Sequence, residues 1–181
     1  MRRSDTSMIG REAEDLASSL LSARGFAVRN LNDERNNYPL YDLVASKAGV
    51  EILISVKCAR AKRELRLGNP HMLQQLADTS VVMAFLPAYK GKEIGFALGD
   101  YELMIIPGYI ARDEALAAHQ HYAIFHPGSA SHSVMVKDKV DRNEGTRSGA
   151  VFMRWHQQFQ DAWAILDAAL SARRQEGQVG G

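Results

Sequence analysis

Apolar residues recur at helical spacing in two long segments, one near each end of the chain. The first has a single apolar face, which predicts a helix from about Ile9 to Leu21, capped by Thr6 or Ser7 and ended by Gly25. The second predicts one long C-terminal helix, whose apolar face carries Phe152, Trp155, Phe159, Ala162, Trp163, Leu166 and Leu170. Both helices therefore have one face that must pack against other structure.

Short apolar runs between these helices predict strands. Residues 26–29 read as a strand, and the polar stretch 30–37 reads as an exposed loop. Residues 41–46 and 51–57 read as two strands of a hairpin, because only a short link containing Gly49 separates them. If residues 47 and 50 close the turn, Leu43 faces Ile54 and Asp42 faces Ser55.

The rest of the chain alternates between helical and strand-like segments. The expected elements are a short helix introduced by Gly68-Asn69-Pro70 and running through Leu73, Leu76 and Ala77, strands at 81–86, 93–98 and 103–106, a helix at 111–119, a loop at 126–133, an edge strand at 134–136 and a polar segment at 138–149. This order predicts an α/β fold with a mixed sheet flanked by helices. We expect one domain over residues 1–175 and a flexible tail over 176–181.

Composition limits the class of protein. The 181 residues are 46% hydrophobic and 24% charged, which is typical of a globular chain. Lys and Arg number 22 against 21 Asp and Glu, so attraction to nucleic acid has to come from a local patch. A single cysteine and the lack of a long apolar run lead us to expect a cytoplasmic protein that does not associate with membranes.

Four features converge on one end of the predicted hairpin. Asp42 begins the first strand, and Lys57 ends the facing one. Glu14 borders the apolar stripe of the first helix and can lean toward the sheet. The segment from 57 to 66 is basic, with Lys57, Arg60, Lys62, Arg63 and Arg66 against Glu64 alone. Together these residues outline an anion-binding site.

Three of these segments resemble motifs of the PD-(D/E)XK nuclease superfamily. They are Gly10-Arg11-Glu12-Ala13-Glu14, Tyr38-Pro39-Leu40-Tyr41-Asp42 and Ile54-Ser55-Val56-Lys57, and the resemblance covers residues 9–86. It implies a restriction endonuclease-like mixed sheet flanked by helices, with a C-terminal helix. It also implies metal-dependent hydrolysis of DNA phosphodiester bonds with Mg²⁺ or Mn²⁺, for example in a bacterial defence system.

The resemblance assigns a role to each matching residue. Asp42 takes the place of the first metal ligand, Lys57 that of the catalytic lysine, and Glu14 that of the auxiliary acid. The second acid should sit two residues before the lysine, where this chain has Ser55. Glu51 is too distant to replace it, since four strand residues separate the two positions by about 13 Å. Glu64 or Glu14 could supply the missing carboxylate as a metal ligand.

Substrate contacts and alternatives complete the prediction. We expect Arg60, Lys62, Arg63, Arg66 and Gln75 to bind nucleic acid, which is DNA in the leading interpretation and RNA in an alternative one. Because of Ser55, a second hypothesis stays open: a catalytically inactive protein of this fold that binds nucleic acid or a protein partner, in an immunity or accessory role. A homodimer is a further alternative, since cutting both strands of a duplex favours one.

Overall fold

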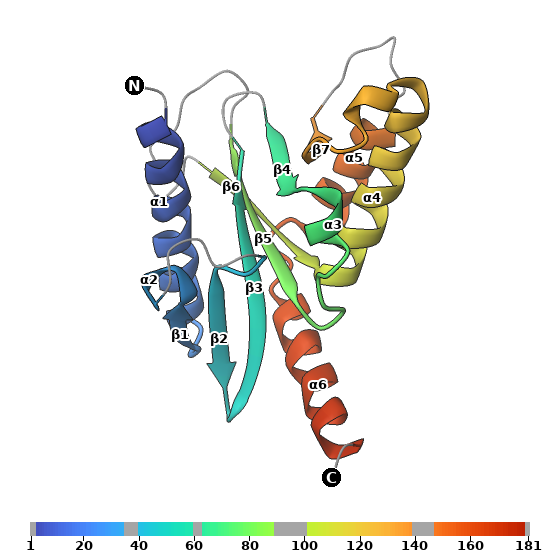
Figure 1. Ribbon diagram of the computed structural model, residues 1–181. Helices are drawn as coiled ribbons and strands as arrows, with labels where there is room; N and C mark the ends of the chain where they lie inside the picture. The colour runs from blue at the N-terminus through green and yellow to red at the C-terminus, as the bar shows by residue number, and fades with distance from the viewer. Residues whose placement is uncertain (1–2, 35–39, 60–62, 89–100, 139–146, 180–181) are drawn as a thin grey trace.

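A five-stranded mixed sheet forms the centre of the molecule (Figure 1). The structure is a computed structural model, and it describes residues 3–34, 40–59, 63–88, 101–138 and 147–179. The strands, in spatial order, are β1 (Ala27–Asn30), β2 (Leu43–Lys47), β3 (Val50–Cys58), β5 (Val81–Pro87) and β6 (Tyr101–Pro107). β3 and β5 run parallel, and the other neighbouring pairs are antiparallel. The predicted α/β class and mixed sheet are confirmed.

Helices cover both faces of this sheet, each over its own apolar cluster. One face packs against α1 (Arg3–Ser22) and α6 (Ala164–Val179). The other packs against α3 (Pro70–Leu73), α4 (Gly108–Phe125), α5 (Arg147–Phe159) and a small antiparallel sheet of β4 (Glu64–Gly68) and β7 (Val134–Lys137). β5 is buried along its whole length because it lies between both layers, which explains its continuous apolar sequence.

The predicted hairpin register is confirmed. Leu43 lies opposite Ile54, and Lys47 lies opposite Val50. Ala48 and Gly49 form the turn, both with positive φ, 52° and 77°, as a tight turn between twisted antiparallel strands requires. The ladder ends at Leu43, so Asp42 and Ser55 do not form the expected ladder pair. Instead the Asp42 N–H donates to the Ile54 carbonyl at 2.9 Å.

Three local elements differ from the sequence prediction. The polar stretch after β1 contains the short helix α2 (Leu31–Glu34) rather than only loop. The basic stretch before residue 66 leads into strand β4, which pairs with β7. In β4 the buried Leu65 and Leu67 alternate with the exposed Arg66, as expected for a strand with one face in the core. The predicted short helix begins at Pro70 as expected, with the Asn69 side chain accepting a hydrogen bond from the Met72 N–H at 2.8 Å, but it ends at Leu73 rather than continuing through Leu76 and Ala77.

The C-terminal third also differs. The predicted single helix is two helices, α5 and α6, because Asp161 turns the chain with φ 48° and Gln160 forms a bridge with Met104 of β6. α6 then continues to Val179, so residues 176–179 are helical rather than a tail. The loop at 126–133 includes the 3-10 helix η1 (Pro127–Ser129).

The structure also tests the predicted ends of the first helix. α1 begins at Arg3, so Thr6 and Ser7 lie inside the helix and do not cap it, whereas Gly25 follows it with φ 80°. The strand predicted at 93–98 lies outside the described residues. Among the helices that the structure describes, none is long and apolar enough to cross a membrane.

Candidate active site

Asp42 is held rigidly at the start of β2. Its N–H donates to the Ile54 carbonyl, and its carbonyl accepts from the Leu31 N–H, each at 2.9 Å. Its carboxylate Oδ2 accepts the Val56 N–H of β3 at 2.7 Å. The neighbouring Tyr41 is buried, and its hydroxyl accepts the Ala77 N–H at 2.8 Å. Both main-chain groups and one carboxylate oxygen are thereby fixed, which is the preorganisation that a catalytic or metal-binding carboxylate needs.

Lys57 stands beside this carboxylate, as the sequence predicted. Its Nζ lies 3.9 Å from Asp42 Oδ2, and the two side chains keep exposed fractions of 24% and 17%. This separation exceeds a hydrogen bond, so the contact is an ion pair that leaves the donor capacity of the ammonium for a further acceptor. Ser55, two residues earlier on the same strand face, is only 2% exposed.

Glu14 reaches the site from α1 through two asparagines that the sequence analysis did not single out. Its Oε2 accepts from Asn30 Nδ2 and its Oε1 from Asn32 Nδ2, both at 3.1 Å. The same Asn32 Nδ2 lies 3.4 Å from Asp42 Oδ1. Asn32 is itself positioned by its N–H, which donates to Asn30 Oδ1 at 2.9 Å. A continuous chain of contacts therefore runs from Glu14 through Asn32 and Asp42 to Lys57.

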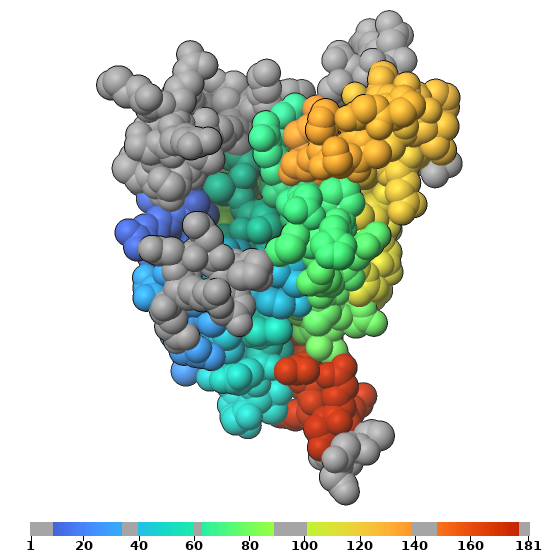
Figure 2. Space-filling view, in the orientation of Figure 1, coloured from blue at the N-terminus to red at the C-terminus, as the bar shows by residue number. Residues whose placement is uncertain are grey.

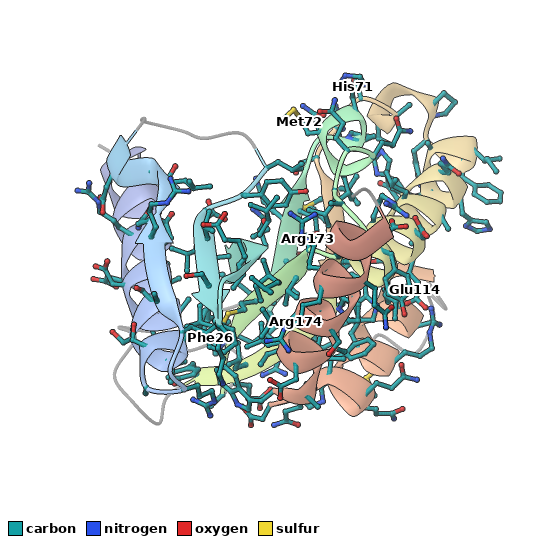
Figure 3. The ribbon with its side chains drawn as sticks, turned by 90° about the horizontal axis from the view of Figure 1, so that it is seen from below. Phe26, His71, Met72, Glu114, Arg173 and Arg174 are labelled. Carbon is teal, nitrogen blue, oxygen red and sulfur yellow. The ribbon has the colours of Figure 1, made fainter. Side chains whose placement is uncertain are left out.

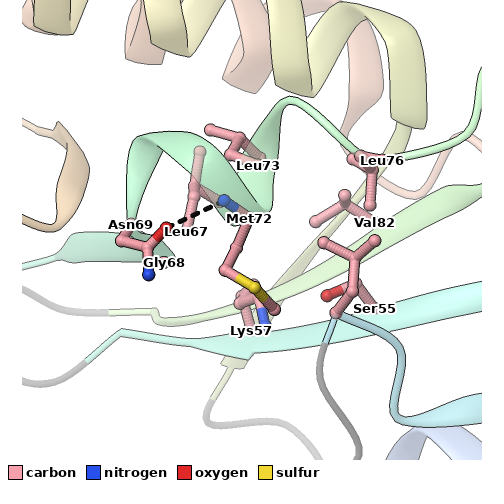
Figure 4. A pocket seen from close by; sticks show the side chains of 10 residues that line it. Ser55, Lys57, Leu67, Gly68, Asn69, Met72, Leu73, Leu76 and Val82 are labelled. Carbon is pink, nitrogen blue, oxygen red and sulfur yellow. Dashed lines mark hydrogen bonds between the residues drawn. The ribbon is translucent and has the colours of Figure 1, made fainter.

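A cavity of about 240 Å³ opens beside Ser55 and Lys57 (Figure 4). Asn69 and Gly68 also line it. Most of its wall is formed by apolar side chains of α3 and its surroundings, namely Leu40, Leu67, Met72, Leu73, Leu76 and Val82. In Figure 2 the surface is hollowed between α1 and the β4–α3 segment, with β3 at the bottom. In Figure 3, His71 and Met72 of α3 lie at the outer rim of the molecule, far from Phe26.

The predicted nucleic-acid contacts do not all lie on this surface. Arg66 is exposed on β4, and Gln75 is exposed just after α3, where its Nε2 lies 3.2 Å from His71 Nε2. Arg63 departs from the prediction, because its side chain is only 8% exposed and is held by Glu102, Asp138 and the Pro87 carbonyl. Its three guanidinium nitrogens all donate hydrogen bonds within the protein, so the group is not available to a phosphate. Arg60 and Lys62 lie outside the described residues.

Glu64, considered above as a replacement acid, is engaged elsewhere. Its Oε1 lies 3.5 Å from Lys137 Nζ across the β4–β7 pair. The contacts of the described residues link Asp42 to Glu14 instead. Within that part of the chain, no group of three or more acidic, histidine or cysteine side chains is placed to hold a metal ion. Among these residues, the acids at this site are Asp42 and Glu14, with neutral oxygen donors beside them.

The donor set nevertheless fits a hard divalent cation. Carboxylate, amide and hydroxyl oxygens are the ligands that Mg²⁺ and Mn²⁺ prefer. Asp42 Oδ1 and Glu14 Oε1 both face the Asn32 amide nitrogen, so the two carboxylates share one small space. Each carboxylate oxygen has two lone pairs, so the hydrogen bonds described above do not exhaust them.

Comparison with known proteins gives likenesses of fold only. No family model and no curated protein matches the chain. A bacterial homing endonuclease is similar in fold, with a TM-score of 0.46 and 14% identity over 94% of this chain and 98% of that one. The Holliday junction resolvase of Archaeoglobus fulgidus is similar with a TM-score of 0.38 and 18% identity, over 56% of this chain and 74% of that one. At these low TM-scores and identities, function has to be inferred from this chain's own residues.

Proposed function

We propose that this protein is a metal-dependent nuclease that hydrolyses phosphodiester bonds in DNA. The observation that carries the proposal is the pairing of a preorganised carboxylate, Asp42, with the partly exposed ammonium of Lys57 at 3.9 Å. A cavity adjoins the pair, and a second carboxylate, Glu14, is linked to Asp42 through Asn32. A site that must bind a phosphodiester and water next to a cation needs these components.

Each of these side chains has a defined part in the proposed reaction. Asp42 and Glu14 would hold a divalent cation, which supplies positive charge to the phosphate and lowers the pKa of water. Lys57 would donate hydrogen bonds to a phosphate oxygen or to the attacking water, because within the described residues its ammonium donates to no protein acceptor. Asp42 would orient the ammonium through its opposite charge, 3.9 Å away. Exposed Arg66 and Gln75 would contact the flanking nucleic acid.

A plasmid-cleavage assay with matched variants tests this function. Purified protein is incubated with supercoiled plasmid in Mg²⁺ or Mn²⁺, alongside Asp42→Asn, Lys57→Met and the control Lys47→Met. Lys47 lies at the opposite, turn end of the same hairpin, where its Nζ donates to the Arg24 carbonyl. We expect wild type and Lys47→Met to nick DNA and the two site variants to lose about 100-fold or more in rate. Cleavage that survives both site substitutions would refute the assignment.

One observation favours a second function, binding of nucleic acid without cleavage. The buried Ser55 stands where the resemblance to the nuclease superfamily places a carboxylate, which leaves the site one negative charge short. Under this alternative, wild-type protein would retain DNA in a salt-dependent manner but would not cut plasmid or single-stranded DNA or RNA in either metal. The same preparation therefore separates the two functions.

A further inference from the structure

The amide of Asn32 occupies a position that suits a metal ligand. Its terminal nitrogen lies 3.1 Å from Glu14 Oε1 and 3.4 Å from Asp42 Oδ1. Neighbouring ligands of an octahedral cation with bonds of about 2.1 Å stand about 3.0 Å apart. The amide position is therefore separated from each carboxylate oxygen by about the distance between adjacent ligands of one ion.

The chemistry of the amide permits this role after one simple movement. An asparagine side chain carries a carbonyl oxygen and an NH₂ group at nearly equivalent positions, and half a turn about its last torsion exchanges them. With the nitrogen toward the two carboxylates, the amide holds them together by hydrogen bonds in the absence of a cation. With the oxygen toward them, it supplies a neutral hard ligand, as asparagine does for Ca²⁺ and similar ions.

We infer that Asn32 is a direct ligand of a divalent cation and completes, with Asp42 and Glu14, a site in which the amide oxygen substitutes for the acid absent at Ser55. The inference rests on the proposed function for its choice of metal and deepens it. The local fold supports this inference. The Asn32 N–H donates to Asn30 Oδ1, and the N–H of the adjacent Leu31 donates to the Asp42 carbonyl. The ligand is thus tied to the strand that carries Asp42.

Asn30 provides a matched control. It donates to the same Glu14 carboxylate at the same distance of 3.1 Å, but to Oε2, and no contact links its side chain to Asp42 within the described residues. Substituting Asn30 removes a hydrogen bond to Glu14 of the same length, together with the acceptor of the Asn32 N–H, but keeps the amide that bridges the two carboxylates. A loss of affinity that is larger for Asn32→Leu than for Asn30→Leu therefore reports on the bridging amide.

Calorimetric titration of Mg²⁺ and Mn²⁺ without nucleic acid tests the inference. We expect wild type to bind one ion, Asn32→Leu to weaken binding about tenfold or more, and Asn30→Leu to weaken it less than Asn32→Leu does. Asn32→Asp adds a third carboxylate, so we expect tighter binding and a larger rise of melting temperature on adding the ion. If the amide only joins the two acids, Asn32→Asp will lower the melting temperature and the ion will not restore it.

The outcomes separate this inference from the proposed nuclease activity. Failure of wild type to bind either ion, or equal affinities for wild type and a folded Asn32→Leu, would overturn the role of Asn32. In the second case, plasmid cleavage by wild type would still support the proposed nuclease activity. Conversely, ion binding that depends on Asn32 in a protein that cuts no nucleic acid would support the site and refute the nuclease.

Discussion

Arg63 is predicted to stabilise the fold rather than bind DNA. Its Nε donates to Asp138 at 2.7 Å, its Nη2 donates to Glu102 at 2.8 Å, and its Nη1 donates to the Pro87 carbonyl. These contacts join the start of β4 to the ends of β5, β6 and β7. Arg63→Met keeps much of the apolar stem but deprives two carboxylates of the guanidinium.

The size of the effect follows from burial. Removing one partner of a buried ion pair costs about 3–5 kcal/mol, because the other charge stays in a low-dielectric environment. Glu102 and Asp138 keep exposed fractions of 23% and 15%, so water compensates in part. We therefore expect Arg63→Met to lower the free energy of unfolding by about 2–4 kcal/mol. With a typical urea dependence of about 2 kcal/mol/M, the midpoint falls by about 1–2 M.

Urea denaturation followed by circular dichroism measures this loss, with Arg66→Ala as the control. Arg66 lies three residues further along, on β4, and is exposed, so its substitution should change stability by less than about 0.5 kcal/mol. If Arg66 contacts phosphate, that variant should instead weaken DNA binding and reduce its salt dependence. The reasoning would be refuted if Arg63→Met unfolded like wild type, or if it stayed fully stable while losing DNA affinity.

Two further predictions concern the same structural framework. Burial raises the pKa of Glu102, but hydrogen bonds from Arg63 and His156 outweigh it and hold the pKa below its usual 4.5. The stability gained from the ionised carboxylate is fully present above pH 4.5 and is lost as the pH falls through the lowered pKa. Glu102→Gln should therefore have a lower free energy of unfolding than wild type at neutral pH, but that free energy should fall less on acidification. Urea denaturation at several pH values measures both effects. In the same assay Gly108→Ala should lower the free energy of unfolding by about 1–3 kcal/mol, because the new Cβ would lie 2.7 Å from the Ala77 carbonyl oxygen. Gly10→Ala, where a Cβ on α1 meets open space, should raise the free energy of unfolding by about 0.5–1 kcal/mol. A stability curve for Glu102→Gln that falls as steeply as that of wild type, or equal effects of the two glycine substitutions, would contradict these explanations.

The parts of the site that sequence could predict are those set by short-range geometry. The hairpin register follows from a four-residue link and strand alternation, and it places Asp42 beside the strand that carries Lys57. The amphipathic face of α1 likewise predicts that Glu14 leans toward the sheet. These inferences need only the regular periods of helices and strands.

The parts that sequence could not predict depend on contacts made by irregular segments or by distant residues. Asn30 and Asn32 stand in a polar stretch with no periodicity, and their role appears only once an asparagine turn brings them to Glu14. Arg63 looks like any solvated basic residue until its partners, Glu102 and Asp138, are brought to it by other strands. The break between α5 and α6 is hidden because apolar spacing continues across it. Strand β4 did carry a signal, the alternation of Leu65, Arg66 and Leu67, which the surrounding positive charge obscured.

Lys57 and Arg63 lie in one basic stretch of sequence, yet the structure gives them opposite characters. Arg63 is buried and bound by two carboxylates and a main-chain carbonyl. Lys57 keeps 24% of its side chain exposed and stands 3.9 Å from a carboxylate that already accepts a main-chain hydrogen bond. Because this pair is partly exposed on both sides and too long for a hydrogen bond, it contributes at most about 1 kcal/mol. Lys57→Met should therefore leave the unfolding free energy within about 1 kcal/mol of wild type while abolishing cleavage, because a group kept for chemistry need not stabilise the fold. A loss comparable with that of Arg63→Met would show instead that the Asp42–Lys57 pair is structural, and the proposed active site would lose its main support.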